Sequence, residues 1–91
     1  MNFTRIDNIK DKVKDWNQVG VEYLTKVFEF SSFEQGQAFI QNVSKFCNEK
    51  DHHPEWKTLE GGIKIEVKLT SHFMGNQLSL LDFEVAEHMN Q

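Results

Sequence analysis

The chain has 91 residues, with 10 Lys plus Arg against 14 Asp plus Glu and a formal net charge of −4. This acidic balance argues against a nucleic-acid-binding protein, which needs basic side chains to neutralise phosphates. No apolar run is long enough to cross a membrane, and the polar, charged N-terminal segment does not resemble a signal peptide, so we expect no membrane association and a cytoplasmic location.

The length predicts one domain over residues 1–91. With a single cysteine, Cys47, the chain cannot form an internal disulfide, and no Cys/His set has the spacing of a structural zinc site. Small domains bury a thin core and often gain stability by oligomerisation. The eight Phe, together with Trp16, Trp56 and Tyr23, are a heavy aromatic load. We expect some of these rings to lie in a subunit interface.

The first third of the chain predicts a helix, a turn and a strand. Ile6, Ile9 and Val13 have a loose helical spacing among alternating charges, which indicates a short, mostly exposed helix over Ile6–Trp16. Asn17–Gly20 then has the composition of a turn. Val21–Phe30 is rich in β-branched and aromatic residues and is predicted to be a strand.

The clearest helix is predicted over Phe33–Glu49. Ser31 or Ser32 can cap it, with Glu34 or Gln35 completing a capping box, and Pro54 prevents its continuation past the histidines. One helical face collects the residues that recur at a spacing of three and four: Gly36, Phe39, Ile40, Val43, Phe46 and Cys47.

The second half predicts a hairpin and a final helix. Glu55–Glu60 and Ile63–Leu69 flank Gly61-Gly62, which is a hairpin signal, and the second run alternates between apolar and charged residues. A last helix is expected from about Ser79, with Leu78, Leu81, Val85 and Met89 on one side. Together these elements predict an α+β fold, with helices packed on one face of an antiparallel sheet.

Three of the four histidines fall at the ends of predicted elements. His52 and His53 lie between a helix and a strand, and His72 follows the alternating strand, so these positions can meet at one sheet edge. Imidazoles there suit acid–base chemistry near neutral pH. The alternative is a favourable interaction of the His-His pair with the helix C-terminal dipole. A metal site lacks the usual ligand spacing. Cys47 is expected to be buried and inert, and His88 to lie on the surface.

One motif resembles a known family. The run EKDHHPEW at 49–56, followed by LTSH at 69–72 and by Asp82, is similar to the pattern of pterin-4a-carbinolamine dehydratases. Upstream, Trp16, FEFSSF at 28–33 and AFI at 38–40 occur in the family's order. The resemblance covers Trp16 to Met89.

The resemblance implies a four-stranded antiparallel sheet with helices on one face. It also implies dehydration of a 4a-hydroxytetrahydropterin to the quinonoid dihydropterin, without a metal or an organic cofactor. His53 is then expected to be the main acid–base group, with His52 and His72 positioning the pterin and sharing proton transfer. Substrate-binding positions by the same resemblance are Asp51, Pro54, Trp56, Thr70, Ser71 and Asp82. Asp82 also has the spacing of a capping box with Ser79.

The resemblance further implies a homodimer or homotetramer and a role in tetrahydrobiopterin recycling beside an aromatic amino-acid hydroxylase. Two features depart from the family. Asn48 stands where an acidic residue is usual, and the hairpin at Gly61-Gly62 is longer by about two residues, an extension that costs little. The alternative function is a non-catalytic interaction or dimerisation protein of the same fold. A metal-dependent hydrolase lacks a ligand set.

Overall fold

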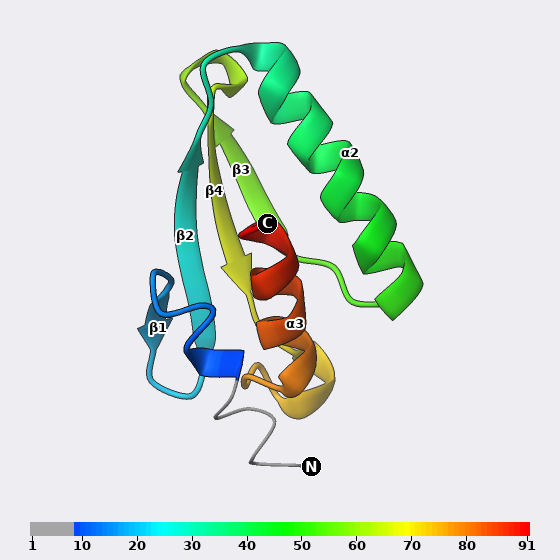
Figure 1. Cartoon of the computed structure of the whole chain (residues 1–91). Coiled ribbons are helices and arrows are strands. Elements are labelled where there is room, and N and C mark those ends of the chain that lie inside the picture. Colours follow the sequence, from blue (N-terminus) through cyan, green and yellow to red (C-terminus); the bar gives the residue numbers. More distant parts are fainter. Residues whose placement is uncertain (1–8) are drawn as a thin grey trace.

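The computed structural model describes residues 9–91 and confirms the α+β fold. Four antiparallel strands form one sheet, and two helices cover one of its faces (Figure 1). The elements follow in the order β1 (Asn17–Val19), β2 (Tyr23–Glu29), α2 (Phe33–Lys50), β3 (Glu55–Leu59), η1 (Glu60–Gly62), β4 (Lys64–Leu69), η2 (His72–Met74) and α3 (Leu80–Met89).

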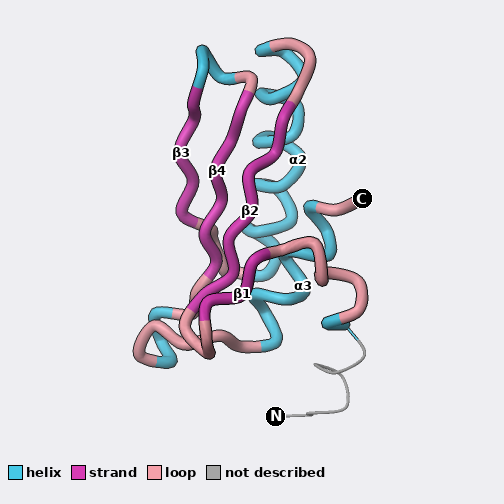
Figure 2. The backbone as a smooth tube through the Cα atoms, turned by 90° about the vertical axis from the view of Figure 1, so that its left-hand side faces the viewer, coloured by secondary structure: helices cyan, strands magenta, loops and turns pink. Residues whose placement is uncertain are grey.

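The strands lie in the spatial order β1-β2-β4-β3, with every neighbouring pair antiparallel. The predicted hairpin is therefore the β3–β4 pair, in which Leu59 faces Lys64 and the four residues between them make the connection. Figure 2 shows the sheet from its uncovered side, with α2 and α3 behind it. The two faces of the sheet therefore differ, because α2 and α3 cover one face and leave the other uncovered. A site at the end of the sheet can open on either of these two sides.

The core lies between the sheet and the two helices. The alternation predicted for β4 is confirmed, since Ile65, Val67 and Leu69 are all fully buried on the helix-covered face. Leu24 of β2 lies directly opposite Leu69 on the same face. Val43 and Cys47 of α2, with Phe83, Val85, Ala86 and Met89 of α3, complete this layer.

The helix α2 begins and ends close to the predicted residues. Ser32 is its N-cap, and the Ser32 hydroxyl accepts a hydrogen bond from the Gln35 backbone N–H at 3.2 Å. The Gln35 side chain reaches back to the N–H of Ser31 at 3.0 Å, one residue earlier than in a standard capping box. These contacts satisfy backbone donors that the first turn leaves without partners.

Gly36 allows the start of α2 to approach the hairpin closely. A methyl group added at Gly36 would come within 2.6 Å of the backbone oxygen of Gly62. Gly62 has a φ of +90°, and a methyl group there would meet the ring of Phe33 at 2.7 Å. Both glycines are therefore required by contact between α2 and η1.

The N-terminal predictions were wrong in part. Residues 6–8 of the expected helix lie outside the described residues, and 11–16 form successive turns instead of continuing a helix. Five of the eight described residues of this segment are exposed, as expected, while Val13 and Trp16 are buried in the core. Asn17–Val19, predicted to be a turn, pairs with β2 as a strand, and the turn moves to 20–22. Asn is a poor strand former, so pairing with β2 overrides local preference here.

Two further features concern the helices. His88, expected on the surface, is half-buried between α2 and α3. Its ring stacks on the ring of Phe46, with 4.1 Å between the two centroids, and its Nε2 lies 2.8 Å from Asn42 Oδ1. The cause is the approach of the two helices, which sequence spacing alone does not reveal. Within residues 9–91, neither helix has the length and apolar content needed to span a membrane.

Candidate functional site

The loop that follows α2 is fixed by the way the helix ends. Asp51 has left-handed backbone angles (φ 52°, ψ 44°), a conformation in which Asp is enriched among residues other than glycine. The N–H of Asp51 donates to Asn48 O at 3.3 Å, and the N–H of His52 donates to Cys47 O at 3.0 Å. This pair of bonds is a Schellman motif. It anchors the backbone of His52 to the last turn of α2, while the exposed Asp51 side chain forms no bond within the described part of the chain.

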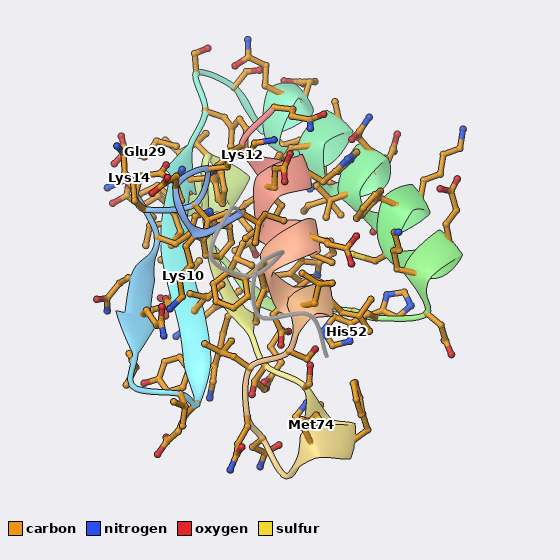
Figure 3. All side chains as sticks on the ribbon, turned by 60° about the horizontal axis from the view of Figure 1, so that its bottom comes forward. Lys10, Lys12, Lys14, Glu29, His52 and Met74 are labelled. Carbon is orange, nitrogen blue, oxygen red and sulfur yellow. The ribbon has the colours of Figure 1, made fainter. Side chains whose placement is uncertain are left out.

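His52 points into the protein and pairs with Asp82. Its Nε2 lies 2.6 Å from Asp82 Oδ1, and the residue is only 7% exposed. Because an ionised carboxylate can only accept, Nε2 carries the hydrogen in this bond. Figure 3 shows His52 at the foot of α3, with Met74 marking η2 nearby. The ring of Phe73, which is also in η2, lies edge-on to the His52 ring, with 6.3 Å between the two ring centroids.

Asp82 is fully buried and holds several groups at once. Its Oδ2 accepts from the Ser71 hydroxyl at 2.7 Å and from the Ser79 backbone N–H at 2.9 Å. The second bond belongs to the capping box at the start of α3, so the predicted Ser79–Asp82 box is confirmed. Asp82 thus joins the loop after α2, the end of β4 and the start of α3 through His52, Ser71 and Ser79. We call these four residues the Asp82 cluster.

His72 lies in a different environment. It begins η2, its side chain is 68% exposed, and its Nδ1 is 2.6 Å from Asn76 Oδ1. Its Nε2 lies 4.0 Å from Glu55 Oε2. A cavity of about 330 Å³ opens beside it, within the size range of small-molecule sites. The cavity is lined by Glu22, Tyr23, Glu55, Lys68, Thr70, His72 and Asn76.

This cavity belongs to the uncovered face of the sheet. Lys68 pairs with Glu55 across β3–β4 and is adjacent to buried Leu69, whose side chain points to the opposite face. Tyr23 likewise alternates with buried Leu24. The Asp82 cluster therefore lies among the helices, and the cavity lies on the other side of the sheet end.

Five of the nine predicted site residues lie in these two places. The His52–His53 loop lies near the turn that contains His72, since the rings of His52 and Phe73 are 6.3 Å apart between their centroids. No hydrogen bond or ring contact within 9–91 joins the three imidazoles to one another. Ser71 and Asp82 belong to the Asp82 cluster with His52, and Thr70 lines the cavity with His72. Asp51 and His53 are exposed, while Pro54 and Trp56 are half-buried.

Thr70 and Trp56 have structural roles as well. The Thr70 hydroxyl donates to Glu22 O at 2.6 Å and so closes one side of the cavity. Trp56 faces Val67 across the β3–β4 pair, which places its ring on the helix-covered face, packed against the core. Trp56 therefore packs against the edge of the core beside β3.

Several residues of the site were not predicted. Tyr23, Lys68 and Glu55 come from three strands and meet only because β2, β4 and β3 are neighbours in this order. The ammonium of Lys68 lies over the Tyr23 ring at 4.5 Å from its centre. For Glu55 a signal existed, because it stands inside the Asp-His-His-Pro-Glu-Trp motif.

Two further features of the described residues concern the cysteine and possible metal ligands. Burial raises the pKa of the Cys47 thiol from 9.0 to about 11, which agrees with the expected inert cysteine. Among residues 9–91, no group of three or more His, Cys, Asp and Glu side chains is arranged to hold a metal ion.

Known proteins resemble this chain over most of its length. The family model for pterin 4 alpha carbinolamine dehydratase matches residues 2–91. A relative from Dinoroseobacter shibae is 36% identical over 76 residues (82% of this chain, 75% of the relative), and one from Bradyrhizobium sp. BTAi1 is 31% identical over 80 residues (87% and 78%). Both are provisionally named pterin-4-alpha-carbinolamine dehydratases.

Solved structures agree with this fold. A transcriptional coactivator/pterin dehydratase from Brucella melitensis superposes with a TM-score of 0.80 at 26% identity, covering 99% of this chain and 94% of that one. A pterin dehydratase-like protein identified as a RuBisCO assembly factor in the alpha-carboxysome has a TM-score of 0.63 at 21% identity, covering 82% and 84%, and shows the fold alone. The match of the family model along nearly the whole sequence, together with the fold, shows that this chain belongs to the pterin-4α-carbinolamine dehydratase family.

Proposed function

We propose that this protein dehydrates a 4a-hydroxytetrahydropterin to the quinonoid dihydropterin as a hydro-lyase of tetrahydrobiopterin recycling. The observation that supports this most is the cavity beside His72, which offers an exposed imidazole and several polar side chains in a space suited to a bicyclic ligand. Membership in the family supports the same reaction.

The reaction requires two proton movements and no redox step. An acid protonates the 4a-hydroxyl group, so that the C4a–O bond breaks and water leaves. The neighbouring ring nitrogen supplies its electron pair to form a C=N bond and gives its proton to a base. Imidazoles can act as either partner near neutral pH, and such groups typically contribute about 10²- to 10⁴-fold in rate.

The environments of the three histidines suggest different roles. Because His53 and His72 are exposed, we assign them the proton transfers, with His53 as the main acid–base group. His52 is buried with its Nε2 bonded to Asp82. We assign His52 a positioning role, in which its bond to Asp82 holds the loop that presents His53. The bond of His72 Nδ1 to Asn76 fixes the orientation of the His72 ring in a similar way.

Alanine variants test these roles. His53→Ala and His72→Ala are expected to lower turnover of a 4a-hydroxytetrahydropterin by about 10²-fold or more. His88→Ala is the matched control, since His88 is an imidazole between the helices and outside both places described. Unchanged turnover in both site variants would refute the assignment.

The alternative is a non-catalytic interaction protein of the same fold. It is favoured by the large apolar side chains that the described residues expose, namely Val21, Val27, Phe33, Phe73 and Met74. Such side chains often mark binding surfaces. This alternative predicts that added 4a-hydroxytetrahydropterin disappears only at its spontaneous rate, which an absorbance assay measures directly.

We also propose that the protein works in the cytoplasm as a homodimer or homotetramer, in a pathway with an aromatic amino-acid hydroxylase. The thin core of so short a chain supports oligomerisation. Light scattering coupled to size exclusion would give the mass, and a monomer at micromolar concentration would refute the assembly.

A further inference from the structure

One carboxylate in the cavity beside His72, that of Glu55, is free to accept hydrogen bonds from a ligand. Glu55 is the first residue of β3, and its Oε2 lies 4.0 Å from His72 Nε2. Within the described residues, Glu55 alone brings a carboxylate this close to the His72 ring. The second carboxylate residue of the cavity, Glu22, is not within that distance.

The groups that could pair with Glu55 are engaged elsewhere. Lys68 faces Glu55 directly across the β3–β4 pair, but its ammonium lies over the Tyr23 ring. His72 uses its Nδ1 to bond Asn76. Among the interactions of residues 9–91, the Glu55 carboxylate forms no hydrogen bond. Both of its oxygens can therefore accept bonds from a ligand in the cavity.

The chemistry of a pterin matches this arrangement. The N3–H and the 2-amino group are two donors side by side on one edge of the ring, and a carboxylate offers two acceptors in the same geometry. Only one ring carbon, C4, separates N3 from C4a, which bears the leaving hydroxyl. A group that binds N3–H and an imidazole that protonates the hydroxyl must therefore be close neighbours, as Glu55 and His72 are.

We propose that Glu55 is the substrate-recognition residue of this site and that its carboxylate accepts hydrogen bonds from N3–H and the 2-amino group of the pterin, with His72 facing the 4a-hydroxyl. This proposal rests on the proposed function. It adds that the cavity recognises the edge of the pterin that carries N3–H and the 2-amino group. The bonds to Glu55 form equally in the ground state and in the transition state, so they contribute to binding more than to the chemical step.

Glu55→Gln tests the proposal, because the amide keeps the size of the side chain but replaces one acceptor by a donor. Glu66→Gln is the matched control, since Glu66 is an exposed carboxylate on the same face of β4 and does not line the cavity. E55Q is expected to raise KM by about ten- to hundredfold with little change in kcat, and E66Q to leave both within twofold.

A second substrate sharpens the test. An analogue that carries hydrogen in place of the 2-amino group removes one of the two donors. The wild-type protein should bind it more weakly than the parent substrate, and E55Q should lose much less from the same change. An equal loss in both proteins would overturn the proposal. So would an E55Q variant with unchanged KM, lower kcat and a displaced pH profile, because the carboxylate would then act on His72.

A binding measurement separates this proposal from the proposed function. The unreactive probe 7,8-dihydrobiopterin keeps the N3–H and 2-amino edge and lacks the 4a-hydroxyl, so its affinity can be measured by calorimetry without turnover. Binding that E55Q weakens at least tenfold and E66Q leaves unchanged supports the role of Glu55, even if turnover is absent. Equal binding by the wild type and E55Q overturns it, even if turnover is present. A wild-type protein that does not bind the probe overturns it as well.

Discussion

The Nε2 atom of His52 lies 2.6 Å from Oδ1 of Asp82, although the two residues are 30 positions apart in the sequence. This bond connects the end of α2 to the first turn of α3, and the other carboxylate oxygen of Asp82 binds Ser71 and Ser79. One buried carboxylate thus determines how three segments meet beside the candidate site. Buried charges of this kind are stable only while their hydrogen bonds are made.

Asp82→Asn should therefore destabilise the fold. The amide keeps the size of the side chain but loses an acceptor for one of its three donors, so a buried polar group is left without a partner. We expect a loss of about 2–4 kcal/mol in the free energy of unfolding, measured by urea denaturation. The control is Glu87→Gln, which removes an ion pair to the exposed Lys12 and should cost less than about 1 kcal/mol. Equal stability of D82N and the wild type would contradict the role of the cluster.

Gly36→Ala should also destabilise the protein, despite the better helix propensity of alanine. The added methyl group would meet Gly62 O at 2.6 Å, and a backbone oxygen cannot move aside cheaply. A net loss of about 1–3 kcal/mol is expected by thermal or urea unfolding. Gln41→Ala places alanine at an exposed position of the same helix and should be neutral or slightly stabilising. If the two variants behaved alike, the close contact between α2 and η1 would be in doubt.

Stability at alkaline pH should depend on Cys47. Its thiol loses a proton at about pH 9.0 when unfolded and at about 11 when folded, because burial raises its pKa. The unfolded chain therefore binds fewer protons in this window, and the free energy of unfolding falls as pH rises from 9 towards 11. The loss from this group is on the order of 2–3 kcal/mol. Below pH 9 the thiol is protonated in both states, so this loss in the free energy of unfolding does not occur.

The comparison with Cys47→Ala isolates this effect, since lysines and tyrosine titrate in the same range. Urea unfolding of both proteins between pH 8 and 11 should show a steeper decline for the wild type. Parallel declines would mean that the thiol ionises as easily in the folded protein as in the unfolded chain.

Asn90 should stabilise the segment before β1. Its Oδ1 accepts from Trp16 Nε1 at 3.1 Å and from Lys26 Nζ at 2.9 Å, and its Nδ2 donates to Lys12 O at 3.0 Å and to Asp15 Oδ1 at 3.1 Å. Asn90→Ala is expected to lower the free energy of unfolding by about 1–2 kcal/mol and to speed hydrogen exchange of the Trp16 indole N–H. Gln91→Ala, next along the chain, should change neither. Unaltered indole exchange in N90A would contradict this.

Much of the fold could be predicted because its signals are local. The spacing of apolar residues in α2, the alternation in β4 and the Ser79–Asp82 capping box depend on neighbours within a few residues. β1 could not be predicted, since three residues carry too little pattern and their strand form depends on pairing with β2. The burial of Trp16 could not be predicted for the same kind of reason, because it depends on Phe28 and Asn90, which are distant in sequence.

The candidate site divides in a similar way. The motif identified His52, His53, His72 and Asp82, but not which side of the sheet end each would face. The burial of His52 follows from the Schellman motif after α2 together with Asp82, a contact that no local spacing shows. Glu55 and Lys68 became neighbours of His72 only once the strand order placed β4 between β2 and β3.

The most direct test of the proposed reaction is the rate at which the wild-type protein removes a 4a-hydroxytetrahydropterin, followed by absorbance and compared with the spontaneous rate in the same buffer. Histidine acid–base catalysis at the cavity beside His72 predicts an acceleration proportional to protein concentration that falls by about 10²-fold or more in His72→Ala. Disappearance of the substrate at the spontaneous rate, with correctly folded wild-type protein present, would contradict it.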